Sequence, residues 1–261
     1  MNRYWCAATT AMVLAGVVST ASASSISQSF SYSEGDHSAA ATFTFSDAGS
    51  GNASLKITLT NTMTSNTGPN WLTGLYFDLA GAPGLDHQGT TGDLVKFNGT
   101  AQTSYSDHFA AQFWAYHGSI QSGELPFGSQ QYGLSAVGAG VFNGGMMLEP
   151  GGPHPQPNGV DGGIVGDFDG VTVPKGHQNQ GNAFLLGSVE FNFLIYEMDY
   201  ADGLASNVAF HFGSGFDEII LTAPPAPIVI PLPAPVAMGV LGLIGLVGVR
   251  RGLARSATTP S

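Results

Sequence analysis

The residues best suited to chemistry are three aspartates in a glycine-rich segment. Asp161, Asp167 and Asp169 stand in the sequence Asp-Gly-Gly-Ile-Val-Gly-Asp-Phe-Asp-Gly, where the glycines allow backbone carbonyls to converge. Calcium prefers about six to eight oxygen ligands, which carboxylates and carbonyls in such a loop partly supply. No glutamate follows at the distance that a helix-loop-helix calcium site requires, so a solvated acidic turn is the alternative interpretation.

Two tryptophans are candidates for contact with carbohydrate. If the indole faces of Trp71 and Trp114 are exposed, they can stack on sugar rings while neighbouring Asn and Asp side chains bind the sugar hydroxyls. The alternative is that both indoles belong to the hydrophobic core.

No set of catalytic residues is predicted. Glu190, Glu197, Asp199 and Asp202 invite comparison with the paired carboxylates of glycosidases. However, Glu190 falls on the polar side of an alternating strand, where a solvated carboxylate needs no catalytic explanation. There is no Gly-x-Ser-x-Gly elbow, no phosphate-binding Gly-Lys-Ser/Thr, and no histidine pair with zinc-like spacing. We interpret the protein as non-enzymatic, with an extracellular hydrolase as the less favoured alternative.

The charge distribution argues against some classes of binding partner. All 18 acidic residues lie between Glu34 and Glu218, where Lys56, Lys96 and Lys175 are the only lysines or arginines, so this body carries a net charge of −15. Such a surface repels nucleic acids and anionic lipids. Because all four arginines lie near the chain ends, the body has no guanidinium group that could form bidentate hydrogen bonds with a phosphate or carboxylate.

The N-terminal residues are typical of an export signal. Arg3 precedes an apolar stretch at 11–18, and Ala21 and Ala23 form the small-x-small pattern that a signal peptidase recognises. The sequence therefore predicts a signal peptide at 1–23 and a mature protein that begins at Ser24.

The C-terminal residues fall into three parts. Prolines dominate 224–235, which predicts a stiff extended spacer. The apolar run 236–249 has 14 residues, or about 21 Å as a helix, and is predicted to anchor the body in the inner membrane, either transiently before processing or permanently. The tail 250–261 begins with two arginines, which favour the cytoplasmic side and leave the body outside.

This order of parts resembles the sorting signals of exosortase-dependent bacterial surface proteins, the PEP-CTERM class, in its Val-Pro-Leu-Pro-Ala variant. Isoleucine replaces the first valine, and 252–261 extends past the usual short basic end. The resemblance implies an exosortase-type processing enzyme as partner, and delivery of the body to the cell surface or to a matrix of exopolysaccharide. The residues that carry it are Ile230, Pro231, Leu232, Pro233, Ala234, Arg250 and Arg251.

The body, residues 24–223, is predicted to be all-β. Apolar and polar residues alternate with a period of two at 41–46, 55–60 and 189–195, and Gly-rich turns separate short strand candidates. This pattern favours an antiparallel, jelly-roll-like β-sandwich. Further strand candidates are 71–79, 133–142, 207–212 and 218–222.

Two segments of the body are expected to depart from this pattern. Phe109, Phe113, Trp114 and His117 fall on roughly one face of a helix that would start at Ser106 or Asp107 and end at Gly118. The segment 143–170 is rich in Gly and Pro and predicts one long surface loop.

The sequence thus predicts an exported surface or extracellular-matrix protein with a structural or adhesive role in biofilm exopolysaccharide. A calcium- or carbohydrate-binding module is the alternative.

Overall fold

The computed structural model describes part of the chain. The chain divides into two compact units, Ala23–Pro231 and a unit made of Met1–Ser22 with Leu232–Ser261. All described residues belong to the first unit. The predicted signal peptide, spacer, sorting motif and apolar segment lie outside the described residues. The described residues are 25–64, 71–98, 101–105, 112–121, 129–137, 142, 146–148, 162–166, 183–213 and 220–222.

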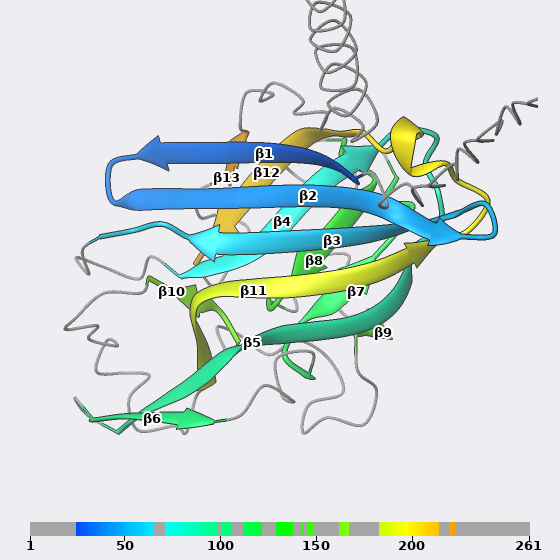
Figure 1. The fold of residues 1–261 in the computed structure, drawn as a ribbon. Helices are drawn as coiled ribbons and strands as arrows, with labels where there is room; N and C mark the ends of the chain where they lie inside the picture. The colour runs from blue at the N-terminus through cyan, green and yellow to red at the C-terminus, as the bar shows by residue number, and fades with distance from the viewer. Residues whose placement is uncertain are drawn as a thin grey trace, which may run out of the picture. The chain divides into compact units, whose positions relative to one another are not determined.

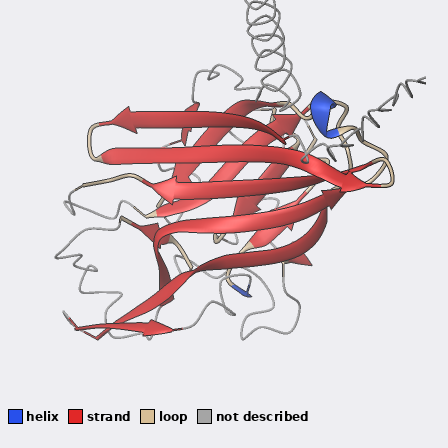
Figure 2. Ribbon diagram, in the orientation of Figure 1, coloured by secondary structure: helices blue, strands red, loops and turns tan. Residues whose placement is uncertain are grey.

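Strands dominate the described residues, which confirms the all-β prediction (Figure 2). A short 3-10 helix at Tyr200–Asp202 separates the last long strands. The strands are β1 Ser25–Glu34, β2 His37–Gly49, β3 Asn52–Asn61, β4 Leu72–Leu79, β5 Asp86–Asn98, β6 Ala101–Tyr105, β7 Ala115–His117, β8 Tyr132–Ser135, β9 Met146–Met147, β10 Ile164–Val165, β11 Ala183–Ile195, β12 Ala205–Phe212 and β13 Ile220–Thr222.

The strand alternation seen in the sequence sets which side chains are buried. In the middle of β2 and β3, and in β11 from Val189 onward, every second residue is apolar and buried, including Phe43, Ile57 and Phe191, while the residues between them face outward. Phe43 lies opposite Ile57, and Ile57 lies opposite Phe191, so the three side chains form one buried row across the sheet.

Hydrogen bonds connect the thirteen strands into one branched sheet. The main path is β1-β2-β3-β11-β10-β4-β8-β7-β9; β5 also pairs with β11 and carries β6, and β12 pairs with β4 and carries β13. All pairs are antiparallel except that of β10 and β11.

The branches face each other across the core. Figure 1 shows β1, β2, β3, β11 and β5 in front of β12, β4, β8 and β7. Aromatic side chains join the two sets: the ring centroids of Phe43 in β2 and Phe77 in β4 are 5.1 Å apart, and those of Trp114 and Phe191 are 5.2 Å apart. Both are edge-to-face arrangements, the geometry that the aromatic quadrupole favours.

The structure contradicts the C-terminal half of the predicted helix at 106–118. Ala115–His117 is strand β7, in which Tyr116 lies between Leu134 of β8 and Met146 of β9. Pairing with two strands satisfies the backbone of β7 and overrides the local helical spacing of its aromatic residues. Residues 106–111 lie outside the described part.

The segment predicted as one surface loop, 143–170, also contains buried structure. Strand β9 lies within it, and Ile164 and Val165 form β10, which sits buried between β4 and β11. This short apolar pair is covered on both sides, which explains its burial despite the surrounding glycines. Upstream of this segment, the strand predicted at 133–142 ends early, at Ser135.

Candidate functional site

The outward face of β1, β2, β3 and β11 is rich in hydroxyl groups. Cross-strand neighbours bind each other there: Ser27 Oγ lies 3.0 Å from Thr44 Oγ1, and Ser29 Oγ lies 2.9 Å from Thr42 Oγ1. Hydroxyl pairs of this kind order a sheet surface without adding charge. The outward face is therefore an ordered polar surface.

A β-bulge breaks this surface where β11 meets β5. The pairing jumps from Leu186 opposite Asp93 to Val189 opposite Gly92, and the intervening Gly187 has a φ of 69°. A side chain at Gly92 would place its Cβ 3.2 Å from the backbone oxygen of Ser188, so the two strands would have to move slightly apart to accommodate it. Bulges redirect side chains, and this one turns Ser188 into a groove.

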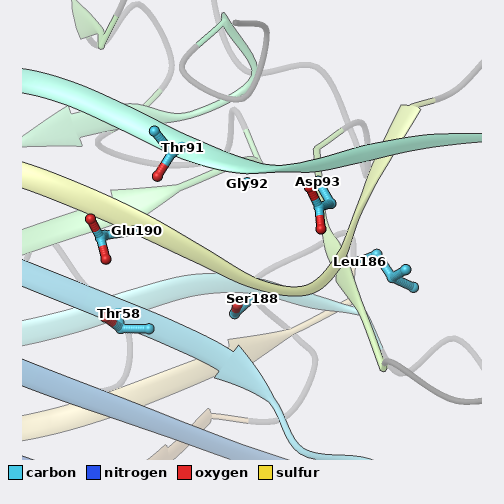
Figure 3. A pocket seen from close by; sticks show the side chains of 7 residues that line it. All are labelled: Thr58, Thr91, Gly92, Asp93, Leu186, Ser188 and Glu190. Atoms are coloured by element: carbon cyan, nitrogen blue, oxygen red, sulfur yellow. The ribbon is translucent and has the colours of Figure 1, made fainter. Parts of the chain in front are cut away.

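The groove has a volume of about 290 Å³ and opens on the outward face. Figure 3 shows Glu190 and Thr91 toward one end, with Asp93 and Leu186 toward the other. The lining is mostly polar and comes from three adjacent strands. The residues that line it are Thr58, Thr91, Gly92, Asp93, Leu186, Ser188 and Glu190.

Glu190 is held in place by its neighbours. It lies directly between Thr58 of β3 and Thr91 of β5. Lys56 Nζ is 3.2 Å from Glu190 Oε2, and Asn192 Nδ2 donates to Glu190 Oε1 at 3.4 Å. Both members of the ion pair are partly exposed, so its contribution to stability is small; its effect is to orient one wall of the groove.

An exposed aromatic ring lies just past the C-terminal end of β11, beyond the groove. Tyr196 follows the last residue of β11 and is 56% exposed. Its hydroxyl donates to Asp86 Oδ2 at 3.0 Å, and Gln88 Nε2 donates to the same oxygen at 3.0 Å. The hydrogen bond to Asp86 raises the pKa of Tyr196, and the negative charge of Asp86 adds to the effect. The ring is thereby fixed at the surface.

The groove and the ring share one face of the sheet. Side chains alternate along a strand, so Glu190, Asn192 and Leu194 project from the same side of β11. Tyr196, in the turn that follows, is linked to Asp86 through its hydroxyl. Asp86 lies directly opposite Leu194, which places the partner of Tyr196 on that side as well. We call this set, with the groove, Asp86 and Gln88, the β11 row.

The two tryptophans proposed for sugar stacking are in the core, so the prediction of exposed indoles is wrong. Trp71 is 5% exposed and lies 5.6 Å from Phe184 between ring centroids. Trp114 is 0% exposed, and its indole Nε1 donates to the backbone oxygen of Gly162 at 2.9 Å. The physical reason is that large aromatic surfaces stabilise this protein through burial, and the indole N–H of Trp114 has a partner inside.

The aspartates proposed for calcium, Asp161, Asp167 and Asp169, lie outside the described residues, and calcium binding there stays a prediction. Among the residues that the structure does describe, no group of three or more His, Cys, Asp or Glu side chains is arranged to hold a metal ion. Two other acidic candidates lie at turns: Asp199 Oδ1 accepts a hydrogen bond from Ala201 N at 2.9 Å, and Glu197 N donates to Asn52 Oδ1.

The residues proposed for sorting, Ile230, Pro231, Leu232, Pro233, Ala234, Arg250 and Arg251, and those at the predicted cleavage site, Ala21, Ala23 and Ser24, also lie outside the described part. Within that part, no helix combines the length and apolar character needed to cross a membrane.

Sequence reasoning placed Glu190 on a polar face but missed its companions. Asp93 and Asp86 join it only through the pairing of β5 with β11, whereas Tyr196 lies six residues beyond Glu190 on the same stretch of chain. One sequence signal was available, because Gly187 interrupts the alternating strand and an isolated glycine in a strand suggests a bulge.

No family model, curated protein or solved structure matches this chain. The function of this protein therefore has to be inferred from its own residues.

Proposed function

We propose that this chain is an exported bacterial protein of the cell surface or extracellular matrix, sorted through its C-terminal signal by an exosortase-type enzyme. The support is the order of its parts in the sequence: a signal peptide, an arginine-free body, a proline-rich motif, an apolar segment and two arginines. The apolar segment, 236–249, anchors the protein in the inner membrane until it is processed.

The body, in this proposal, is a β-sandwich with an adhesive role in exopolysaccharide. The single observation that supports the role is the β11 row, where hydroxyl, amide and carboxylate groups surround a groove and an exposed tyrosine ring. Sugar polymers present hydroxyl groups and apolar ring faces, and this surface offers partners for both. Because Glu190 is paired with Lys56, we do not propose a hydrolase.

Sorting is tested by the chemical form of the exported protein. Mass spectrometry of the protein from the producing cell should show a chain that begins at Ser24 and ends near Ala234. Deletion of the exosortase gene should leave Arg250 attached and the protein in the membrane fraction. A tail retained equally in both strains would contradict the proposal.

A matched pair of variants isolates the motif from the spacer. Replacing Pro231 and Pro233 with alanine should block processing. Replacing Pro225 and Pro227, which lie in the same spacer outside the motif, should leave processing intact. Equal processing of both double variants would show that the motif is not what the enzyme reads.

A further inference from the structure

We infer that the β11 row binds a linear polysaccharide without charged groups, with one sugar ring on Tyr196 and the following sugars along β11 to the groove at Asp93. This inference rests on the adhesive role proposed above, but it does not depend on how the protein is sorted.

The hydroxyl of Tyr196 orients its ring at the surface. A single exposed tyrosine is ordinary on a protein surface, but this ring is held by its hydroxyl. Asp86, which accepts that hydrogen bond, is itself bound by Gln88. A ring that is already fixed loses little conformational freedom when a ligand stacks on it, so more of the contact energy remains as affinity. The neighbouring amide and carboxylate are suitable partners for hydroxyls at the edge of a sugar ring.

The β11 row is long enough for several sugar rings. Tyr196 lies six residues beyond Glu190, or about 20 Å at the usual rise of a strand. The groove begins at Glu190 and continues past Ser188 to Asp93. A site of this length, which follows β11 and takes its sides from β3 and β5, fits several sugars of an extended chain better than a single sugar.

The β11 row is rich in carboxylates. The row contains Asp86, Asp93 and Glu190, and the ammonium of Lys56 is already paired with Glu190. A polyuronate would therefore meet like charges on the row and on a body of −15. Hydroxyl groups of a neutral glycan, in contrast, donate to these carboxylates through charge-assisted hydrogen bonds.

The groove is already formed without a ligand. The bulge at Gly187 and the close approach at Gly92 fix the groove through backbone geometry. Most small-molecule sites with measurable affinity are largely preformed in this way.

The test uses the exported protein purified from the producing cell. It is applied to an immobilised panel of neutral glucans, mannans and xylans, with alginate and polygalacturonate as acidic members. We expect retention on at least one neutral polymer and none on the acidic ones. No retention on any neutral polymer, or retention on the acidic ones alone, would overturn the inference.

Variants locate the site. Tyr196→Ala and Asp93→Ala should each weaken binding about tenfold, the loss typical of a central contact residue. Leu204→Ala and Asp202→Ala are matched controls, because they remove an exposed apolar and an exposed acidic side chain outside the row. Full binding by both row variants would place the contact elsewhere and overturn the inference.

Two measurements keep the result interpretable. Tyr196→Phe retains the ring and loses the bond to Asp86, so it should bind more tightly than Tyr196→Ala if stacking is the main contact; equal loss in both contradicts stacking. Thermal melts of each variant show whether folding is intact. Failure of neutral-glycan binding with correct processing at Ala234 would refute this inference alone, whereas unprocessed protein that still binds glycan would refute the sorting proposal alone.

Discussion

The side-chain amide of Gln28 in β1 pairs with both backbone groups of Ala205 in β12. Ala205 N donates to Gln28 Oε1 at 2.7 Å, and Gln28 Nε2 donates to Ala205 O at 3.5 Å. Both residues are buried. The amide therefore acts as an additional peptide group, and it joins the two branches of the sheet at an edge where no strand ladder connects them.

This contact predicts a marked loss of stability in Gln28→Ala. The change leaves the N–H and C=O of Ala205 without these bonds in a buried position, which costs about 1–3 kcal/mol. Urea unfolding should report this decrease in the free energy of unfolding. The control is Ser29→Ala, the adjacent residue on the exposed side, which should change it by less than about 0.5 kcal/mol. Equal stability of the two variants would show that the amide does not hold the branches together.

A second prediction concerns packing at Gly203. A Cβ at this position would lie 2.4 Å from Cδ1 of Phe45, a fully buried ring on β2. Gly203→Ala should therefore destabilise the protein by about 1–3 kcal/mol, as overpacked cores do. Gly84→Ala is the matched control, because its Cβ would meet nothing within 4 Å. A lowered melting temperature in both variants would point to backbone entropy or turn geometry instead of packing.

The burial of the tryptophans is directly measurable. The protein that begins at Ser24 retains Trp71 and Trp114 as its only tryptophans. Their emission should be blue-shifted in the native state, and iodide should quench it weakly until denaturant is added. Neutral glycan at saturating concentration should leave both properties unchanged. Strong iodide quenching of the native protein would restore the interpretation that these indoles are exposed.

Alkaline pH should unfold the protein through its buried phenols. Tyr132 donates its hydroxyl to the backbone oxygen of Pro83 at 2.6 Å, and burial, with the charge of Asp78 adding to it, raises its pKa to about 12. The neutral phenol is therefore favoured by the fold. Its contribution to stability is complete below pH 10, the pKa of tyrosine in the unfolded chain, and is lost between pH 10 and 12.

The measurement is the free energy of unfolding between pH 8 and 12. Tyr132→Phe should lower it by about 1 kcal/mol at pH 8, because a hydrogen bond is lost. Above pH 10 the variant should lose stability less steeply than the parent, by up to about 1.4 kcal/mol per pH unit for one proton. The variant should not become pH-independent, since burial also raises the pKa of Tyr76 and Tyr116. Identical slopes would show that Tyr132 ionises equally in both states.

Strands with a clean period of two were predictable from the sequence. Phe43, Ile57 and Phe191 alternate with polar residues, and this pattern alone indicates a buried face. The pattern does not show which strands are neighbours, because pairing of β3 with β11 depends on contacts between residues far apart in the chain. For this reason the β11 row could not be assembled from the sequence.

The errors have a common cause. Local spacing predicts a helix at Tyr116, and the surrounding glycines predict a loop at Ile164. Both are strand residues because partners elsewhere in the chain supply their hydrogen bonds and cover their apolar atoms. Trp71 likewise shows that composition around an aromatic residue does not determine whether its ring is buried.

The pairing of β3 with β11 also sets the order in which a chain that emerges from its N-terminus can fold. On the export route proposed above, strands β1, β2 and β3 would emerge first and could form their hairpins at once, since they are consecutive. The inner face that they present, including Phe43 and Phe45, is covered only after β4, β11 and β12 have emerged. Such long-range pairing is slow, because a large loop must close before its contacts form. On the export route proposed above, the core would therefore close only after β11 and β12 have crossed the membrane.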